Sequence, residues 1–202
     1  GLILPLGTWV MQAACEQIER WRHSALGELV VSVNVSSHQI YTEDFLETVK
    51  NTVLGTGIEP YKLELEITES MLMRDIESTI ETLVRLKNFG VGLSIDDFGT
   101  GYSSLSYLKR FPIDALKIDT SFVRELQSDN DDAAICAAIL AMAHTLDLKV
   151  VAEGVEVESQ ADYLREHSCD QIQGYLFSKP VPASSFENLF YDHQRSLKSV
   201  AG

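Results

Sequence analysis

Residues 94–105 read Ser-Ile-Asp-Asp-Phe-Gly-Thr-Gly-Tyr-Ser-Ser-Leu, and this stretch decides how the rest of the chain is interpreted. An alternating strand over residues 91–95 leads directly into two adjacent carboxylates, Asp96 and Asp97. The two glycines that follow favour a tight turn because glycine tolerates positive φ, and the paired serines favour the start of a helix. Taken alone, the two aspartates could serve only as turn and cap residues. Other predicted strands end in a similar way, which argues against that interpretation.

The same strand-then-helix unit recurs along the chain. Strands are predicted over residues 29–35, 63–68, 91–95, 115–119, 149–153 and 170–174, and helices over residues 5–25, 42–54, 75–89, 103–110, 131–146, 158–166 and 183–191. Strands that alternate with helices pair in parallel through right-handed crossovers. This pattern leaves two architectures, an open doubly wound sheet or a (β/α)8 barrel.

The two faces of the predicted strands differ, and this difference favours the barrel. Residues 31–35 and 63–68 each alternate between aliphatic and polar side chains. A half-solvated antiparallel sheet would alternate too, but the helices between the strands disfavour it. In a barrel the apolar faces meet the outer helices, and the inner face forms a reaction site at the C-terminal mouth. We therefore predict an α/β fold of the TIM-like (β/α)8 barrel type that lacks its N-terminal strand or strands, because six units are two short of eight.

The composition is that of one large domain. The 202 residues, of which 45% are hydrophobic, suit a single domain over residues 1–192 with a C-terminal tail over 193–202. No apolar run approaches the roughly 20 residues of a membrane span. The net charge of −14 disfavours nucleic-acid polymers as partners. Cys15, Cys136 and Cys169 indicate free thiols in a reducing compartment. We expect a cytoplasmic location, including as the cytoplasmic part of a larger membrane-anchored protein.

Polar side chains gather at the predicted strand ends. They are Asn34, Glu66 with Glu69, Asp96 with Asp97, Lys117 with Asp119, Glu153 with Glu156, and Gln173. Each could be a turn residue, a helix-start charge or a solvated surface group when considered singly. Together they place seven carboxylates and one ammonium around a single barrel mouth.

So many carboxylates predict bound cations. Two like charges about 4 Å apart cost on the order of 4 kcal/mol at an effective dielectric of 20, and several such pairs would rival the roughly 5–15 kcal/mol stability of a domain. An all-oxygen ligand set without clustered histidine or cysteine selects Mg²⁺ or Mn²⁺. Adjacent carboxylates can also bridge two metal ions about 3.5–4 Å apart, the arrangement used in phosphoryl chemistry.

The sequence resembles a known family, the EAL-type phosphodiesterases that linearise the second messenger cyclic di-GMP. The resemblance runs from residue 1 to about residue 190. Its motifs are Asn-Val-Ser-Ser-His-Gln at 34–39, Glu-Leu-Glu-Ile-Thr-Glu at 64–69, the stretch at 96–105, Leu-Lys-Ile-Asp at 116–119, Ala-Glu-Gly-Val-Glu at 152–156 and Gln-Gly-Tyr-Leu-Phe-Ser-Lys-Pro at 173–180.

The resemblance implies a role for each residue at the mouth. Asn34, Glu66 and Asp96 are expected to bind a first divalent cation, and Asp96, Asp97 and Glu153 surround a second. Lys117 helps to position and activate the attacking water, with Glu153 as its catalytic partner. Glu69 braces the loop that contains Phe98, Gly99, Thr100 and Gly101. Asp119, Glu156 and Gln173 lie in the outer shell.

One departure from the family pattern bears on activity. The Glu-Ala-Leu triplet that names the family does not occur in residues 1–202, and the resemblance expects it upstream. Its glutamate is a metal ligand in the family, and a nearby arginine contacts the substrate. Without that glutamate this segment alone could be inactive.

Three functions fit these residues. The favoured one is a phosphodiesterase that opens cyclic di-GMP to linear pGpG with two Mg²⁺ or Mn²⁺ ions. The second is a degenerate receptor that binds cyclic di-GMP without cutting it. The third is an enolase-like barrel with Lys117 as the proton-abstracting base. The resemblance further implies a homodimer formed through the Asp-Asp-Phe-Gly loop and fusion to upstream sensory or diguanylate-cyclase-like domains.

Overall fold

The computed structural model describes residues 1–101, 105–126 and 130–200, and its centre is one parallel sheet. The strands β1 to β6 are hydrogen-bonded in sequence order. Their bounds are Val31–Asn34, Leu63–Thr68, Gly92–Phe98, Ala115–Ile118, Lys149–Ala152 and Gln171–Ile172. The helices are α1 Ile3–Trp21, α2 Ser37–Ile40, α3 Phe45–Thr56, α4 Glu69–Leu72, α5 Ile76–Phe89, α6 Leu105–Leu108, α7 Thr120–Arg124, α8 Asn130–Thr145, α9 Glu158–Glu166 and α10 Ala183–Val200, with a 3₁₀ turn at Pro60–Lys62.

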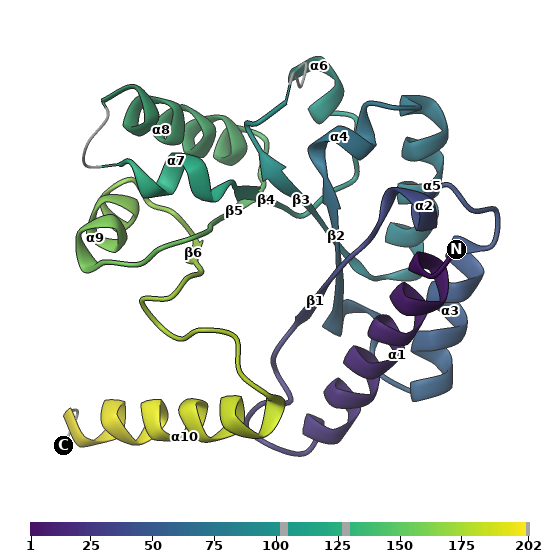
Figure 1. Cartoon of the computed structure of the whole chain (residues 1–202), viewed down its shortest axis with the longest axis horizontal. Coiled ribbons are helices and arrows are strands. Elements are labelled where there is room, and N and C mark those ends of the chain that lie inside the picture. Colours follow the sequence, from purple (N-terminus) through teal and green to yellow (C-terminus); the bar gives the residue numbers. More distant parts are fainter. Residues whose placement is uncertain (102–104, 127–129, 201–202) are drawn as a thin grey trace.

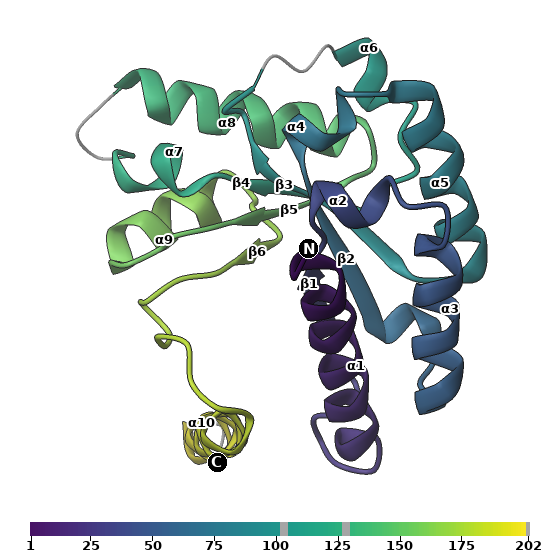
Figure 2. The same ribbon diagram turned by 45° about the vertical axis from the view of Figure 1, so that its right-hand side comes forward.

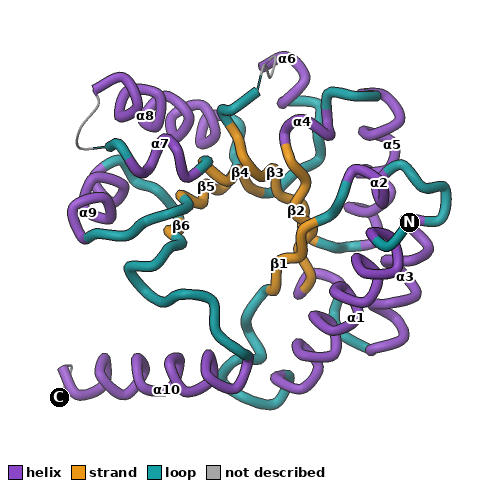
Figure 3. Tube along the Cα trace, viewed as in Figure 1, coloured by secondary structure: helices purple, strands orange, loops and turns teal. Residues whose placement is uncertain are grey.

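The sheet curls into part of a barrel. In Figures 1 and 3 the strands follow an arc, the helices α1 to α9 lie along its convex side, and β1 and β6 form its two edges. A doubly wound sheet would reverse its strand order at a switch point and carry helices on both faces. The sequential order therefore confirms the predicted (β/α)8-type fold without its N-terminal strands. Figure 2 shows α10 separate from this ring of helices, below the open side of the arc.

The hydrophobic core lies between the sheet and the outer helices. Leu63, Leu65 and Ile67 of β2 are at most 1% exposed, and Leu93 and Ile95 of β3 are equally buried. Complete burial of one such side chain contributes roughly 1.5–3 kcal/mol. Because the aliphatic residues occupy every second position, the residues between them must face the concave side of the sheet.

Strand β3 differs from the prediction in a way that affects the site. It continues to Phe98 instead of ending at residue 95, so both aspartates belong to it. Its pairing with β4 shifts between Ile95 and Phe98, and Asp97 has a φ of +54°. Such an irregularity lets two consecutive side chains turn towards one region, whereas regular pleating sends them to opposite faces.

Several helix boundaries also differ from the predictions. A short helix α2 precedes α3, which begins three residues later than expected, and α7 was not predicted because only five residues form it. Helix α1 ends at Trp21 instead of residue 25. Helix α10 continues to Val200 through the residues expected to form a frayed tail. The predicted helix start at Ser103 and Ser104 lies outside the described residues. Within the described part of the chain, no helix is both long and apolar enough to cross a membrane.

Candidate functional site

Strand register brings the predicted site residues to one end of the sheet. Asn34 at the end of β1 lies opposite Glu66 of β2, and Thr68 of β2 lies opposite Asp96 of β3. Lys117 occupies the inward position of β4. Because parallel strands end at the same edge, side chains from different strands converge at the C-terminal mouth.

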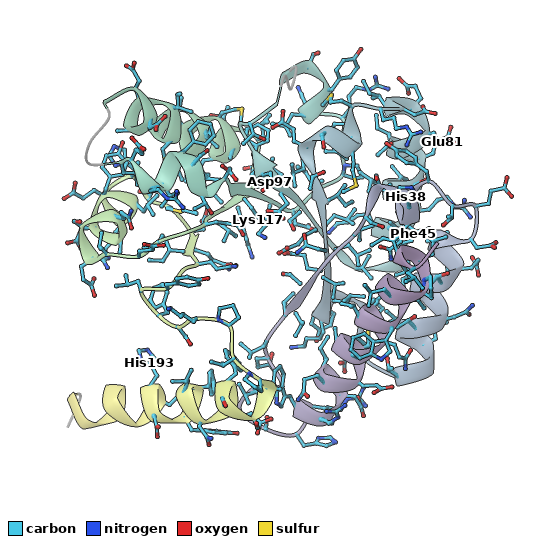
Figure 4. All side chains as sticks on the ribbon, in the orientation of Figure 1. His38, Phe45, Glu81, Asp97, Lys117 and His193 are labelled. Atoms are coloured by element: carbon cyan, nitrogen blue, oxygen red, sulfur yellow. The ribbon has the colours of Figure 1, made fainter. Side chains whose placement is uncertain are left out.

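Lys117 is the centre of this convergence. Its side chain is buried, and its Nζ lies 2.7 Å from Oε1 of Glu153, 2.8 Å from Oε2 of Glu66 and 3.2 Å from Oδ1 of Asp96. Figure 4 shows Lys117 and Asp97 on the concave side of the sheet, far from His193 on α10. A snorkelling lysine would leave its ammonium in water. The ammonium of Lys117 instead joins carboxylates from the neighbouring strands.

The charges of this cluster shift the pKa values of its members. Burial raises the pKa of Glu66 and of Glu153, and the hydrogen bonds to Lys117 offset this only in part. Burial alone lowers the pKa of Lys117, but its bonds to the two glutamates outweigh that effect and raise it overall. Burial and the nearby charges of Asp96 and Asp119 raise the pKa of Asp97. Four carboxyl groups, those of Glu66, Asp96, Asp97 and Glu153, thus stand against one ammonium in this cluster.

A divalent cation fits a group of three carboxylates, of which Asp97 is not paired with Lys117. Asp96, Asp97 and Glu153 each offer an oxygen atom, and these three atoms lie within 4.8 Å of one another. The positive φ of Asp97 is what brings its carboxylate to the same side as Asp96. Carboxylate oxygens are the ligands that Mg²⁺ and Mn²⁺ prefer. Asn34 is exposed and adjacent in register to Glu66, so an amide oxygen is available at the edge of the cluster.

Glu69 connects the end of β2 to the glycine loop after β3. It is 3% exposed, and its Oε2 accepts a hydrogen bond of 2.9 Å from the backbone N–H of Gly99. Its Oε1 faces Gly101, where an added Cβ would lie only 2.6 Å away. Gly99 has a φ of +100°, and a Cβ there would meet the ring of Phe122 at 2.8 Å. Gly99 is therefore required by its positive φ and by the Phe122 ring, whereas Gly101 allows the end of the Glu69 side chain to approach closely.

The other predicted loop residues are placed less centrally. Phe98 is buried in the hydrophobic core, and the hydroxyl of Thr100 donates to the carbonyl of Asp97 at 2.9 Å. Asp119 caps α7 by accepting from the N–H of Ser121 at 2.9 Å. Partial burial alone raises the pKa of Asp119, but the bonds from Ser121 outweigh it, so the pKa is lowered overall.

Two predicted outer-shell residues are not brought into the cluster by their side chains. Glu156 and Gln173 are both exposed. The N–H of Glu156 donates to Gln160, and the carbonyl of Gln173 accepts from Val155, so both are held by their backbones. Within the described residues, neither side chain forms an ion pair or hydrogen bond with the carboxylates around Lys117.

A second polar layer beneath the cluster was not predicted. The Oε1 of Glu64 accepts hydrogen bonds from the hydroxyls of Ser32 at 2.9 Å and of Ser94 at 3.2 Å. These residues lie two positions before Asn34, Glu66 and Asp96, on the same inward parity. That shared parity is the signal in the sequence that could have identified them.

A family model and curated relatives of this chain point to the same protein family. The protein-family model described as EAL domain matches residues 1–180 of this chain. The bifunctional diguanylate cyclase/cyclic di-GMP phosphodiesterase MucR of Pseudomonas aeruginosa is 47% identical over 183 residues, which cover 91% of this chain and 27% of that protein. The cyclic di-GMP phosphodiesterase NbdA of the same organism is 45% identical over 204 residues, which cover 99% of this chain and 26% of that protein. The chain thus spans about a quarter of the length of these curated relatives.

Solved structures are equally similar. The PaMucR phosphodiesterase in complex with c-di-GMP superposes with a TM-score of 0.90 at 46% identity, covering 92% of this chain and 75% of that one. The EAL domain of Mycobacterium smegmatis DcpA superposes with a TM-score of 0.87 at 45% identity. The superposition covers 93% of this chain and 84% of that one.

Proposed function

Because the chain belongs to the EAL domain family, we propose that it is a metal-dependent phosphodiesterase that hydrolyses cyclic di-GMP to linear pGpG. The observation that carries the proposal is the buried ammonium of Lys117 among the carboxylates of Glu66, Asp96 and Glu153. The relatives MucR and NbdA, both named as cyclic di-GMP phosphodiesterases, support the choice of substrate.

Two divalent cations, Mg²⁺ or Mn²⁺, are proposed as cofactors. Asn34, Glu66 and Asp96 would hold one, and Asp97 and Glu153 would share the other with Asp96. When bound, such ions supply Lewis acidity at the phosphate and offset the negative charge that develops there. The excess of carboxylates over ammonium groups in the cluster supports this assignment.

Lys117 is proposed to act as a fixed positive charge. Three carboxylates around an ammonium favour its charged form, so it can donate hydrogen bonds to water and to phosphate oxygens. Fixed cations of this kind stabilise the transition state of phosphoryl transfer. The same surroundings disfavour the base role that an enolase-like reaction would require of Lys117.

The alternative function is that of a receptor that binds cyclic di-GMP without cutting it. Receptors of this kind lose carboxylates or the glycine loop, whereas residues 1–202 contain the site carboxylates from Glu66 to Glu153 and both loop glycines. The test is to incubate the full-length protein with cyclic di-GMP and Mg²⁺ and to separate the nucleotides by chromatography. We expect pGpG to accumulate and EDTA to stop its formation. Tight binding of cyclic di-GMP without any pGpG would establish the receptor instead.

The assembly and location are proposed on the same basis. We infer a homodimer through the loop at 98–101, because Glu69 links that loop to the end of β2 and could transmit a dimer contact to the site. We also infer fusion to upstream sensory or cyclase-like domains and a location on the cytoplasmic side, where a second messenger acts.

A further inference from the structure

A cavity of about 370 Å³ lies beside the mouth, between the segment after β1 and the segment after β2. Its lining residues are Val35, Ser36, Ser37, Tyr41, Thr68, Ser70, Met71 and Arg74. Helices α2 and α4, which contribute to these segments, are neighbours at the same end of the sheet in Figures 1 and 2. The volume lies within the range of small-molecule sites. None of the residues assigned to the catalytic cluster lines it.

The lining is unusual for a chain with a net charge of −14, because it contains an arginine and no carboxylate. Arg74 is exposed, and its guanidinium lies 5.1 Å from the centre of the Tyr41 ring. Among the described residues no carboxylate pairs with it. A guanidinium held over an aromatic ring keeps its planar set of donors free for a ligand.

The hydroxyl groups of the cavity divide into committed and available donors. Ser36 donates to Oε1 of Gln39, and Tyr41 donates to the carbonyl of Met71. Thr68 and Ser70 share one hydrogen bond of 3.2 Å, so one of their two hydrogens remains. In the described part of the chain, the hydroxyl of Ser37 has no assigned partner.

The cavity thus has three available hydrogen-bond donors: the Arg74 guanidinium, the Ser37 hydroxyl and one hydroxyl of the Thr68–Ser70 pair. Several donors around one space suit a tetrahedral oxyanion. A phosphate monoester presents three strong acceptor oxygens and a charge of about −2, and arginine binds it through two parallel hydrogen bonds. A bare ion would leave much of the 370 Å³ empty, which provides space for the organic part of an ester.

We propose that this cavity binds the phosphate group of a small phosphate monoester and that its occupancy is transmitted to the glycine loop. Thr68 and Ser70 line the cavity, whereas Glu69 between them holds the N–H of Gly99. A ligand on one side of this three-residue segment therefore acts on the residue that braces the loop on the other side. The binding step does not depend on the proposed phosphodiesterase activity.

The test is a titration of the full-length protein with inorganic phosphate and, separately, with guanosine 5′-monophosphate. EDTA is present throughout, so that no metal ion in the carboxylate cluster can bind phosphate. Calorimetry measures Kd, and NMR follows the amide signals of Ser37 and Gly99. We expect saturable binding, with both amide signals shifting at the same midpoint. Equal Kd values would assign recognition to the phosphate alone, and a lower Kd for the nucleotide would show that the rest of the ester contributes.

Arg74→Gln is the decisive variant, and Arg85→Gln is its matched control, because each removes one positive charge from an exposed arginine. Loss of a charge-assisted hydrogen bond to the phosphate should raise Kd at least about ten-fold in Arg74→Gln only. Ser37→Ala should raise Kd several-fold. Absence of saturable binding in the wild type, or equal Kd values in the two arginine variants, would overturn the site. A static Gly99 signal during saturable binding would overturn the coupling.

Discussion

At the scale of single residues, the proposed chemistry depends most on Lys117. Its ammonium is buried at the end of β4 and contacts three carboxylates that lie on or directly after the other strands. Each of those carboxylates would be costly to bury without a partner. Lys117 therefore offsets part of the negative charge of the metal-free cluster and offers a fixed charge to the reaction.

Lys117→Ala should lower kcat at least about 100-fold, because one preorganised electrostatic group is lost from the site. KM should change much less, since the proposed metal ligands remain. Steady-state kinetics of the full-length protein with Mg²⁺ measures both constants. Lys50→Ala is the control, because Lys50 of α3 forms an ion pair with Glu47 one turn away and is not part of the cluster around Lys117. A near-normal kcat in Lys117→Ala would remove this residue from the mechanism.

At the scale of elements, the loop after β3 is held by a residue from another strand end. Glu69 follows β2 directly, yet it accepts the N–H of Gly99 and packs against Gly101. The loop therefore depends on the relative position of two neighbouring strands. We regard Glu69 as a positioning residue that acts through Asp96 and Asp97.

Glu69→Ala should lower kcat while the protein stays folded, because a brace is lost and the hydrophobic core is unchanged. The Gly99 amide should also exchange its hydrogen faster, since its acceptor is gone. Kinetics, circular dichroism and hydrogen exchange measure these three properties. An unaltered kcat together with faster exchange would show that the brace is structural only.

A second prediction at this scale concerns the attachment of α8 and β5 to the start of β6. Partial burial alone raises the pKa of Asp170, but the N–H of Val150 at 2.8 Å and the ring of His144 at 3.0 Å outweigh it, so the pKa is lowered. A carboxyl with a depressed folded-state pKa stabilises the protein above its unfolded value near 3.9, and this stabilisation is lost as the pH falls through the folded value.

Asp170→Asn should therefore be less stable than the wild type at neutral pH, by roughly 1 kcal/mol or less because the pair is partly exposed. The difference should shrink as the pH falls below about 4. Chemical denaturation at a series of pH values measures it. A difference that grows towards acid would contradict the assigned role of Asp170.

At the scale of the whole molecule, the curved sheet concentrates negative charge at one end. Parallel strands place their C-terminal side chains around one mouth, and a net charge of −14 adds long-range repulsion. The metal-free fold therefore contains an electrostatic cost that a bound cation would relieve.

Mg²⁺ should raise the unfolding temperature of the protein. At 100 times its Kd, a ligand that binds only the folded state adds about 2.7 kcal/mol, which corresponds to roughly 5–10 °C for a domain of this size. Scanning calorimetry measures the shift, with NaCl at equal ionic strength as the control. Asp97→Asn should reduce the shift. An equal effect of NaCl would mean that the ions only screen charge.

Much of the fold could be predicted from local pattern. Alternation of strands and helices indicates parallel pairing, and alternation within β2 separates core residues such as Leu65 from inward residues such as Glu66. The oxygen-only donor set also predicts a hard cation such as Mg²⁺ or Mn²⁺. Such properties depend on residues that are close in sequence, and for that reason they are visible without coordinates.

Other properties were decided only by the tertiary structure. The shift in β3 that turns Asp97 towards Asp96 exists only relative to β4, because a bulge is defined by the strand beside it. The partners of Lys117 depend on the register of separate strands, and the cavity beneath Arg74 forms only when the segments after β1 and β2 meet. The sequence by itself determined which side chains point inward and what chemistry they offer. Only long-range pairing decided which of them touch, because contact requires the positions of distant strands to be set against one another.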